Sequence, residues 1–308
     1  MIMTVTLNPA LDYLISLETL EQGAIQRFSQ SAFAPGGKGV NVSLLLSSLG
    51  VENRALGVAA GFSGREICRL LEAQGCPTDF VLLEEGTSRI NVKVRTPQGE
   101  ETDLNGEGPQ IPAEGVDRLL EKLETLEPGD FLVLAGSLPP GLPEGAYPRI
   151  LETTRRRGAR LMVDTTGDAL LAALPYRPFL IKPNAEELGQ LFGVEIADVG
   201  AAKEYGLQLQ RMGARNVVVS MGERGALLLE EGGRSLYCHG VRGRTVSTVG
   251  AGDSLVAGFL FGYLLHGTAE GGLRWGVAAG AATAFREGIA TGDQVKAQFP
   301  AVENPHPV

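Results

Sequence analysis

Short apolar runs alternate with segments of helical periodicity along most of the chain. The apolar runs lie at 2–7, 130–136, 160–164, 178–184 and 216–222. The helical patterns lie at 144–157, around 200–212, at 254–265 and at 269–286. Short continuous apolar strands separated by helices are typical of a parallel sheet that is buried on both faces. The pattern therefore predicts an α/β fold with a mainly parallel central sheet covered by helices.

The segment 89–95, RINVKVR, follows a different pattern. Its polar side chains alternate strictly with branched apolar ones, which is the period of a strand with one polar and one apolar face. We expect its partners at 100–105 and within 13–34, in a small antiparallel sheet that stands off the main fold. The polar face is basic. It is either an ordinary solvated face or the inner face of a lid that closes over an anion.

Length and composition indicate an ordinary globular chain. Of its 308 residues, 44% are hydrophobic and 20% are charged, and no linker-like tract interrupts them. We therefore predict a single domain over 1–308, with the lid inserted from parts of about 11–35 and 88–106. No apolar run reaches the length of a membrane span, and the N-terminus lacks a signal-peptide pattern. Three cysteines without a CxxC pair favour a reducing, cytoplasmic setting.

Charge and histidine content argue against several classes of protein. A formal net charge of −9 disfavours nonspecific binding of nucleic acid, although a local basic pocket can still hold a small anion. The three histidines form no HExxH motif, and none stands beside a serine nucleophile. A zinc hydrolase and a histidine-based triad are therefore not expected. We expect neither nucleic acid nor a membrane as a partner.

Asp253 stands in a Gly-rich turn at the start of a predicted helix, directly after Gly250, Ala251 and Gly252. The β-branched residues at 245–249 predict the end of a strand before this turn. A turn without bulky side chains lets backbone N–H groups approach an anion closely. An acid in the first turn is also an ordinary way to cap a helix. The stretch by itself leaves both explanations open.

Two further segments carry candidate ligands. GGKG at 36–39 precedes a predicted helix, but it is not a Walker A motif because Gly39 stands where Ser or Thr is required. KPNAEEL at 182–188 ends a predicted buried strand and places Asn184 and Glu187 three residues apart. These two side chains either face Mg²⁺, directly or through water, or form the capping box of a helix.

Six motifs together resemble the ribokinase-like sugar kinases, specifically the phosphofructokinase-B branch. In chain order they are TLNPALD at 6–12, GGKGVNVS at 36–43, GSLPPG at 136–141, KPNAEEL at 182–188, SMGERGA at 220–226 and STVGAGDS at 247–254. They cover nearly the whole chain. The resemblance implies a three-layer α/β/α domain with a small β lid. It also implies an enzyme that uses ATP and Mg²⁺ to phosphorylate a sugar hydroxyl.

The resemblance implies roles for single residues as well. Asp253 would accept the proton of the attacking hydroxyl, and the N–H groups of Ala251, Gly252 and Asp253 would hold the transferring phosphoryl group. Asn184 and Glu187 would organise Mg²⁺, partly through water. The positions that match nucleotide-binding residues are Lys182, Asn184, Ser220, Gly222, Gly225 and Ser247. Those that match sugar-binding residues are Asp12, Gly37, Lys38 and Asn41, and those that match residues on an existing sugar phosphate are Arg89, Ser137 and Arg27, the last from a partner subunit.

Within the branch, the segments SRINVKV, EETDLN and GEGPQI are most similar to the 1-phosphofructokinases. This implies conversion of fructose 1-phosphate to fructose 1,6-bisphosphate. A tagatose-6-phosphate kinase or a fructose-6-phosphate kinase of the same family is the alternative. A catalytically silent sugar-phosphate sensor would need a damaged GAGD or NxxE motif, and both are intact. The exposed lid sheet further predicts a homodimer that forms through the lid.

Overall fold

A ten-stranded sheet forms the centre of the computed structural model, which describes residues 1–28, 30–97 and 101–308. Its parallel strands are β1 (Ile2–Thr6), β4 (Arg54–Ala60), β5 (Val81–Leu83), β8 (Phe131–Ala135), β9 (Arg160–Asp164), β10 (Leu180–Ile181) and β11 (Asn216–Ser220). An antiparallel edge adds β12 (Gly225–Leu229), β13 (Ser235–His239) and β14 (His306–Pro307). The order is β14-β13-β12-β11-β10-β9-β8-β1-β4-β5. The carboxyl ends of the parallel strands therefore meet at one edge of the sheet.

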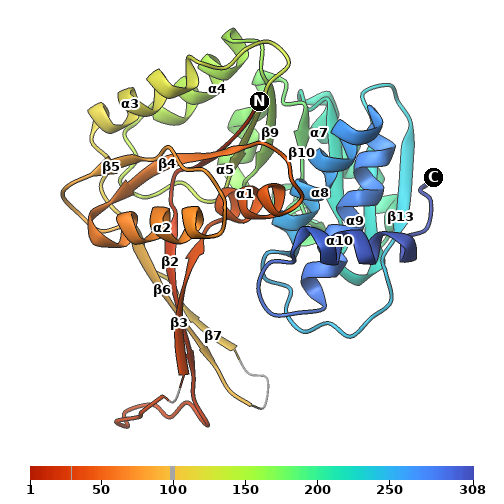
Figure 1. The fold of residues 1–308 in the computed structure, drawn as a ribbon. Coiled ribbons are helices and arrows are strands. Elements are labelled where there is room, and N and C mark those ends of the chain that lie inside the picture. The colour runs from red at the N-terminus through yellow and green to blue at the C-terminus, as the bar shows by residue number, and fades with distance from the viewer. Residues whose placement is uncertain (29, 98–100) are drawn as a thin grey trace.

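Helices cover both faces of this sheet (Figure 1). One layer contains α3 (Ala113–Leu123), α4 (Ala146–Arg156), α5 (Gly167–Ala173), α6 (Ala185–Phe192) and α7 (Val199–Arg211). The other contains α1 (Lys38–Ser48), α8 (Ala251–His266), α9 (Ala269–Ala284) and α10 (Gly292–Gln298). Two layers form because successive strand residues point to opposite faces: in β8, Leu132 joins the first core and Val133 the second. The predicted three-layer α/β/α fold is confirmed.

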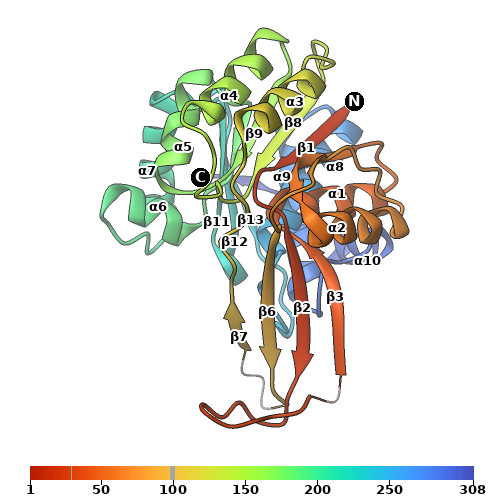
Figure 2. The ribbon, with the colours of Figure 1, turned by 90° about the vertical axis from the view of Figure 1, so that its left-hand side faces the viewer.

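The lid is a second sheet that stands off the carboxyl edge of the central sheet (Figure 2). Its strands are β2 (Ala10–Ser16), β3 (Gln30–Gly36), β6 (Arg89–Arg95) and β7 (Glu101–Leu104), in the order β3-β2-β6-β7. The outer pairs β2–β3 and β6–β7 are antiparallel, whereas the central pair β2–β6 is parallel. This pair is parallel because both strands run outward from the central sheet. Helix α2 (Gly61–Ala73) packs against β2, β3 and β4.

Several boundaries follow the sequence pattern closely, and two expectations need correction. Strands β6 and β9 coincide with the predicted runs 89–95 and 160–164. The segment 245–249 is not the end of a strand: the N–H of Val246 donates to the Ala284 carbonyl at the end of α9 (2.8 Å) instead of pairing with a strand. Within 178–184, only Leu180 and Ile181 form a strand. Residue 100, where the predicted strand 100–105 begins, lies outside the described residues.

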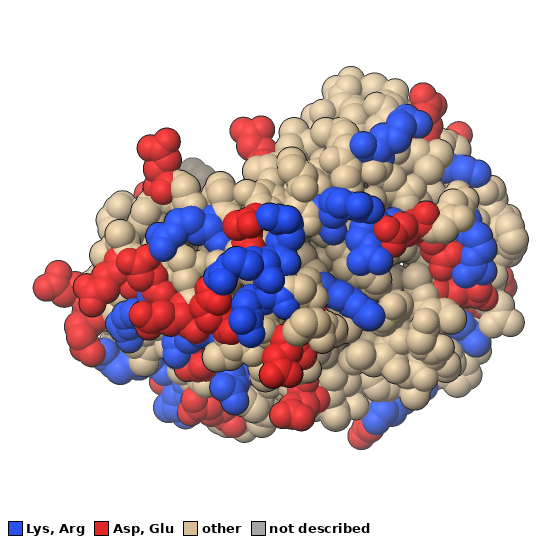
Figure 3. Space-filling model, turned by 90° about the horizontal axis from the view of Figure 1, so that it is seen from above, with Lys and Arg blue, Asp and Glu red and all other residues tan. Residues whose placement is uncertain are grey.

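The face on the side of α3 and α4, opposite the lid, carries acidic and basic side chains intermixed (Figure 3). Arg149 lies 2.6 Å from Asp117, and Arg156 pairs with Glu124, so ion pairs join the two helices. Exposed pairs of this kind contribute little to stability. In the described parts of the chain, none of the helices combines the length and the apolar character needed to cross a membrane.

Candidate active site

A cavity of about 1510 Å³ lies between the inner face of the lid and the carboxyl edge of the central sheet. Its walls come from the polar face of the lid, from the first turns of α1, α6 and α8, and from the loop between α9 and α10. This edge of an open α/β sheet is where such folds bind ligands. The predicted site residues that line the cavity are Asp12, Gly37, Lys38, Asn41, Arg89, Lys182, Asn184, Glu187, Ser220, Gly222, Gly225, Ser247, Gly250, Ala251, Gly252 and Asp253.

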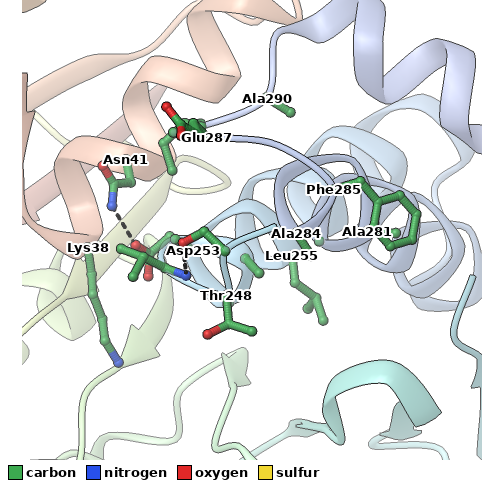
Figure 4. Close-up of a pocket in the computed structure, with 18 of the residues that line it drawn as sticks. Lys38, Asn41, Thr248, Asp253, Leu255, Ala281, Ala284, Phe285, Glu287 and Ala290 are labelled. Atoms are coloured by element: carbon green, nitrogen blue, oxygen red, sulfur yellow. Dashed lines mark hydrogen bonds between the residues drawn. The ribbon is translucent and has the colours of Figure 1, made fainter. Parts of the chain in front are cut away.

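Asp253 does not cap helix α8. The N-cap is Gly250, whose φ of 76° lies in the left-handed region, and no side chain bonds to the first-turn N–H groups. The residue Asp253 is 6% exposed, and its carboxylate accepts a hydrogen bond of 2.7 Å from Asn41 Nδ2 (Figure 4). Of the three N–H groups expected to bind an anion, that of Ala251 instead donates to the Thr248 carbonyl at 3.2 Å. The N–H groups of Gly252 and Asp253 are left without an intrahelical acceptor. The turn thus combines an anion-binding helix end with a buried carboxylate.

A network of charged side chains lies beside this carboxylate, with Asp164 and Lys182 buried and Lys38 one third exposed. Lys38 Nζ lies 3.2 Å from Asp164 Oδ1 and 3.6 Å from Glu187 Oε1. Lys182 Nζ lies 3.4 Å from the same Asp164 oxygen. Burial and the charge of Asp164 raise the pKa of Asp253 to about 6, while its amide partner and the two lysines oppose this shift. Burial would lower the pKa of Lys38, but the surrounding carboxylates together raise it. A carboxylate with a pKa near 6 is well matched to accepting a proton at neutral pH.

Asp164 is a member of this network that the sequence analysis missed. It ends strand β9, and its side chain is 1% exposed. Its Oδ2 atom is buried and has no hydrogen-bond partner among the described residues. The available signal was an acid at the carboxyl end of an apolar strand, which is the edge where α/β sheets bind ligands.

Asn184 and Glu187 form the capping box of α6. The N–H of Asn184 donates to Glu187 Oε2 at 2.8 Å, and the N–H of Glu187 donates to Asn184 Oδ1 at 2.7 Å. Within the described residues, no three His, Cys, Asp or Glu side chains are grouped so that they could hold a metal ion. The buried, unpartnered oxygen of Asp164 and the second oxygen of Glu187 are hard ligands beside an anion-binding turn. They fit a Mg²⁺ ion held largely through water and phosphate oxygens.

The basic residues along the lid are largely neutralised on the lid itself. From the root of β6 to its tip, the inner face carries Arg89, Asn91, Lys93 and Arg95. Lys93 Nζ lies 3.3 Å from Asp12 Oδ2, and Arg95 Nε lies 2.9 Å from Glu101 Oε1. Asn91 and Lys93, which were not assigned from the sequence, also line the cavity.

Arg89 differs from these two cations because it forms no ion pair among the described residues. Its Nε donates to the Asn8 carbonyl at 3.1 Å, which fixes the guanidinium at the root of the lid. Burial lowers the pKa of Arg89, and the nearby Asp12 opposes this. Among the cations on this strand, Arg89 at the root of the lid is therefore the one that stays available to an anion in the cavity.

The other end of the cavity is apolar. Figure 4 shows Leu255, Ala281, Ala284 and Phe285 beyond Asp253, along α8 and the end of α9. Gly243 faces the ring of Phe285, where an added Cβ would come within 2.3 Å of the ring. An apolar compartment that leads to an anion-binding turn suits a ligand with a flat base at one end and phosphates at the other.

Two predicted site residues do not line the cavity. Arg27 is exposed in the loop between β2 and β3, at the tip of the lid, and Ser137 is exposed after β8. Within one chain, recognition of a phosphate on the acceptor would therefore depend on Arg89.

Comparisons with known proteins show which family this chain resembles along nearly its whole length. The profile of the pfkB family of carbohydrate kinases matches residues 5–296. The 1-phosphofructokinase of Bacillus subtilis is 43% identical over 304 residues, which cover 98% of this chain and 99% of that protein. The D-tagatose-1-phosphate kinase of Bacillus licheniformis is 36% identical over 290 residues, 94% of each chain. The structure of phosphofructokinase-2 from Escherichia coli in complex with fructose-6-phosphate is 29% identical, with a TM-score of 0.90 over 97% of this chain and 98% of that one.

Proposed function

The chain belongs to the pfkB family of carbohydrate kinases, and from this premise we propose that it transfers the γ-phosphoryl group of ATP to fructose 1-phosphate, forming fructose 1,6-bisphosphate. Fructose 1-phosphate is favoured as acceptor because a 1-phosphofructokinase is 43% identical over nearly the full chain. The observation that carries the chemistry is the buried carboxylate of Asp253, which is not needed as a helix cap and lies beside an anion-binding turn.

Asp253 accepts the proton of the hydroxyl that attacks the γ-phosphorus. A pKa of about 6 leaves this carboxylate mostly ionised at neutral pH, and Asn41 holds it in place. The N–H groups of Gly252 and Asp253 donate to oxygens of the transferring group, where negative charge is concentrated. Lys38 and Lys182 add positive charge on the same side. Phosphoryl transfer depends mainly on such positioning and charge neutralisation.

The donor nucleotide would occupy the remaining length of the cavity. Its base fits the apolar compartment around Leu255 and Phe285, and its phosphates reach past Ser220 and Ser247 to the first turn of α8. Asn184 and Glu187 would hold Mg²⁺ through water, and the ion neutralises phosphate charge when it is bound. The capping box fixes both side chains for this second task.

We also propose that residues 1–308 act as one kinase domain in a homodimer joined through the lids. The outer lid surface supports this: Phe33 is 51% exposed and stacks on Tyr13 with ring centroids 4.6 Å apart, and Phe28 is 44% exposed. Exposed aromatic clusters of this kind are typical of protein interfaces. Cys68, Cys76 and Cys238 are free thiols, which fits a reducing cytoplasm.

Steady-state kinetics with ATP and a panel of acceptors tests the substrate. The panel contains fructose 1-phosphate, fructose 6-phosphate, tagatose 1-phosphate, tagatose 6-phosphate and fructose. Fructose 1-phosphate should give the highest kcat/KM, and fructose should be poor because Arg89 then has no phosphate to bind. A higher kcat/KM with another hexose phosphate would replace the proposed acceptor. Absence of turnover with every sugar phosphate would refute the kinase activity, and a protein that binds sugar phosphates without phosphorylating them would remain as the explanation.

The variant Arg89→Ala tests how the acceptor phosphate is recognised. A charge-assisted contact to phosphate is worth about 1.5–3 kcal/mol, so the KM for fructose 1-phosphate should rise roughly ten- to a hundred-fold. The KM for ATP should hardly change. Arg95→Ala is the matched control on the same strand, because its cation is already paired with Glu101, and it should change the acceptor KM by less than about fivefold. Equal effects of both variants would refute a phosphate site at Arg89.

A further inference from the structure

The carboxylate of Asp12 is held on three sides at the centre of the inner lid face. Asn91, its neighbour across β2–β6, donates from Nδ2 to Asp12 Oδ1 at 2.7 Å. Lys93 Nζ lies 3.3 Å from Asp12 Oδ2. On the β3 side the carboxylate lies over Gly36, where a Cβ would come within 2.7 Å of Oδ2. Only a glycine at 36 leaves room for this orientation.

The pair between Lys93 and Asp12 is not an ordinary solvated pair. The side chains of Lys93 and Asp12 are only 14% and 15% exposed, and both line the cavity. The second acid near Lys93, Asp103 on β7, is farther away at 3.9 Å and is 38% exposed. The ammonium group is therefore directed mainly to Asp12, and desolvation makes the pair stronger than a surface pair.

We propose that Asn91 and Lys93 are positioning residues that orient Asp12 to read the configuration of the acceptor hydroxyls. This rests on the proposed sugar-phosphate kinase function. Each carboxylate oxygen already has one partner on the lid, so the remaining acceptor positions face the cavity. A carboxylate fixed in this way accepts hydrogen bonds from two hydroxyls only when they have the matching relative orientation. Fructose and tagatose phosphates differ in the configuration of one hydroxyl, so a rigid Asp12 discriminates between them.

Discrimination between the two epimers depends on how many polar groups of the site lose their hydrogen-bond partner when the wrong epimer binds. A site built to hydrogen-bond a hydroxyl rejects an analogue that cannot make the bond, because the buried polar group loses its partner. If Asp12 could rotate freely, it would follow either epimer, and the selection would be lost. Lys93 and Asn91 prevent this rotation from two directions, while Arg89 binds the phosphate that both epimers share.

The test uses Lys93→Met, which removes the charge and keeps most of the side-chain length. The KM for fructose 1-phosphate should rise about tenfold, and the KM for ATP should stay within twofold. The ratio of kcat/KM for fructose 1-phosphate to that for tagatose 1-phosphate should fall at least threefold. Lys93→Arg should restore most of this ratio, because it restores the charge beside Asp12. Asn91→Ala, which removes the other partner, should lower the ratio independently.

Asp103→Asn is the control, since it removes the other acid near Lys93 without touching Asp12, and it should change neither the KM values nor the ratio by more than twofold. An unchanged epimer ratio in both Lys93→Met and Asn91→Ala would overturn the inference. So would an equal rise of the KM values for ATP and for the sugar phosphate, since that would indicate a general distortion of the lid. Turnover of sugar phosphates by the wild type tests the proposed function separately, because it does not depend on either variant.

Discussion

Replacing Asp253 by Asn should abolish turnover and at the same time stabilise the protein. Burial and the charge of Asp164 raise the pKa of Asp253 from its ordinary 3.8 to about 6. The native state therefore holds this proton more tightly than the unfolded state does, and stability falls as the pH rises between about 4 and 6. The difference of about 2.2 pH units corresponds to an order of ~3 kcal/mol at neutral pH. Asp253→Asn removes this cost, while the new amide oxygen can still accept from Asn41.

Denaturant unfolding of the wild type and Asp253→Asn at pH 7.5 and near pH 4 measures the effect. At pH 7.5 the free energy of unfolding should be higher in the variant by up to about 3 kcal/mol, and the difference should shrink towards pH 4. Turnover should fall by about 10²–10⁴-fold or more, as expected for a lost general base. The affinity for nucleotide should stay within several-fold.

Asp164→Asn is the matched control, because it changes the other buried aspartate of the same network. Asp164 partners both Lys38 and Lys182, so its loss leaves two ammonium groups without this carboxylate and should lower stability. It also removes a charge that raises the pKa of Asp253, so the acid limb of the kcat/KM profile should move to lower pH. A variant Asp253→Asn that is less stable than the wild type at pH 7.5, or that keeps more than about a tenth of its kcat, would refute the reasoning.

Three further predictions concern the metal, the lid and the assembly. Glu187→Gln should raise the Mg²⁺ concentration needed for activity and lower kcat. The melting temperature should change little, because Gln also completes a capping box. An unchanged Mg²⁺ titration together with a large loss of stability would show that Glu187 serves only as part of the helix cap. Arg95 Nη1 lies 3.5 Å from Glu287 in the loop after α9, and we predict that this pair couples the binding of an ATP analogue to that of the sugar phosphate. Glu287→Gln should weaken this coupling by about two- to fivefold in calorimetry, and equal coupling in the wild type and the variant would exclude such a link. Phe33→Asp should convert the proposed dimer to monomers in analytical ultracentrifugation, and an unchanged mass would exclude this surface.

Local patterns by themselves determined the elements whose signals lie within a few residues. The alternation at 89–95 predicted β6 residue by residue, since a strand with one polar face has a period of two. The spacing of Asn184 and Glu187 predicted either a capping box or a metal site, and the capping box is present. The Gly-rich turn before Asp253 predicted a helix start that can hold an anion. These features depend on neighbours in the sequence, so the sequence contains them.

Only the tertiary structure decided which charges meet. Asp164 and Lys38 are separated by 126 positions and touch because β9 ends and α1 begins at the same edge of the sheet. The alternation in β6 placed Lys93 and Arg95 on one face, but the register with β2 and β7 decided that both are neutralised and that Arg89 is not. That Asp253 does not cap its own helix, and that its carboxylate accepts from Asn41 of another helix, is likewise visible only in the tertiary structure. Pairing across strands and helix ends depends on how the whole chain packs, which no single segment encodes.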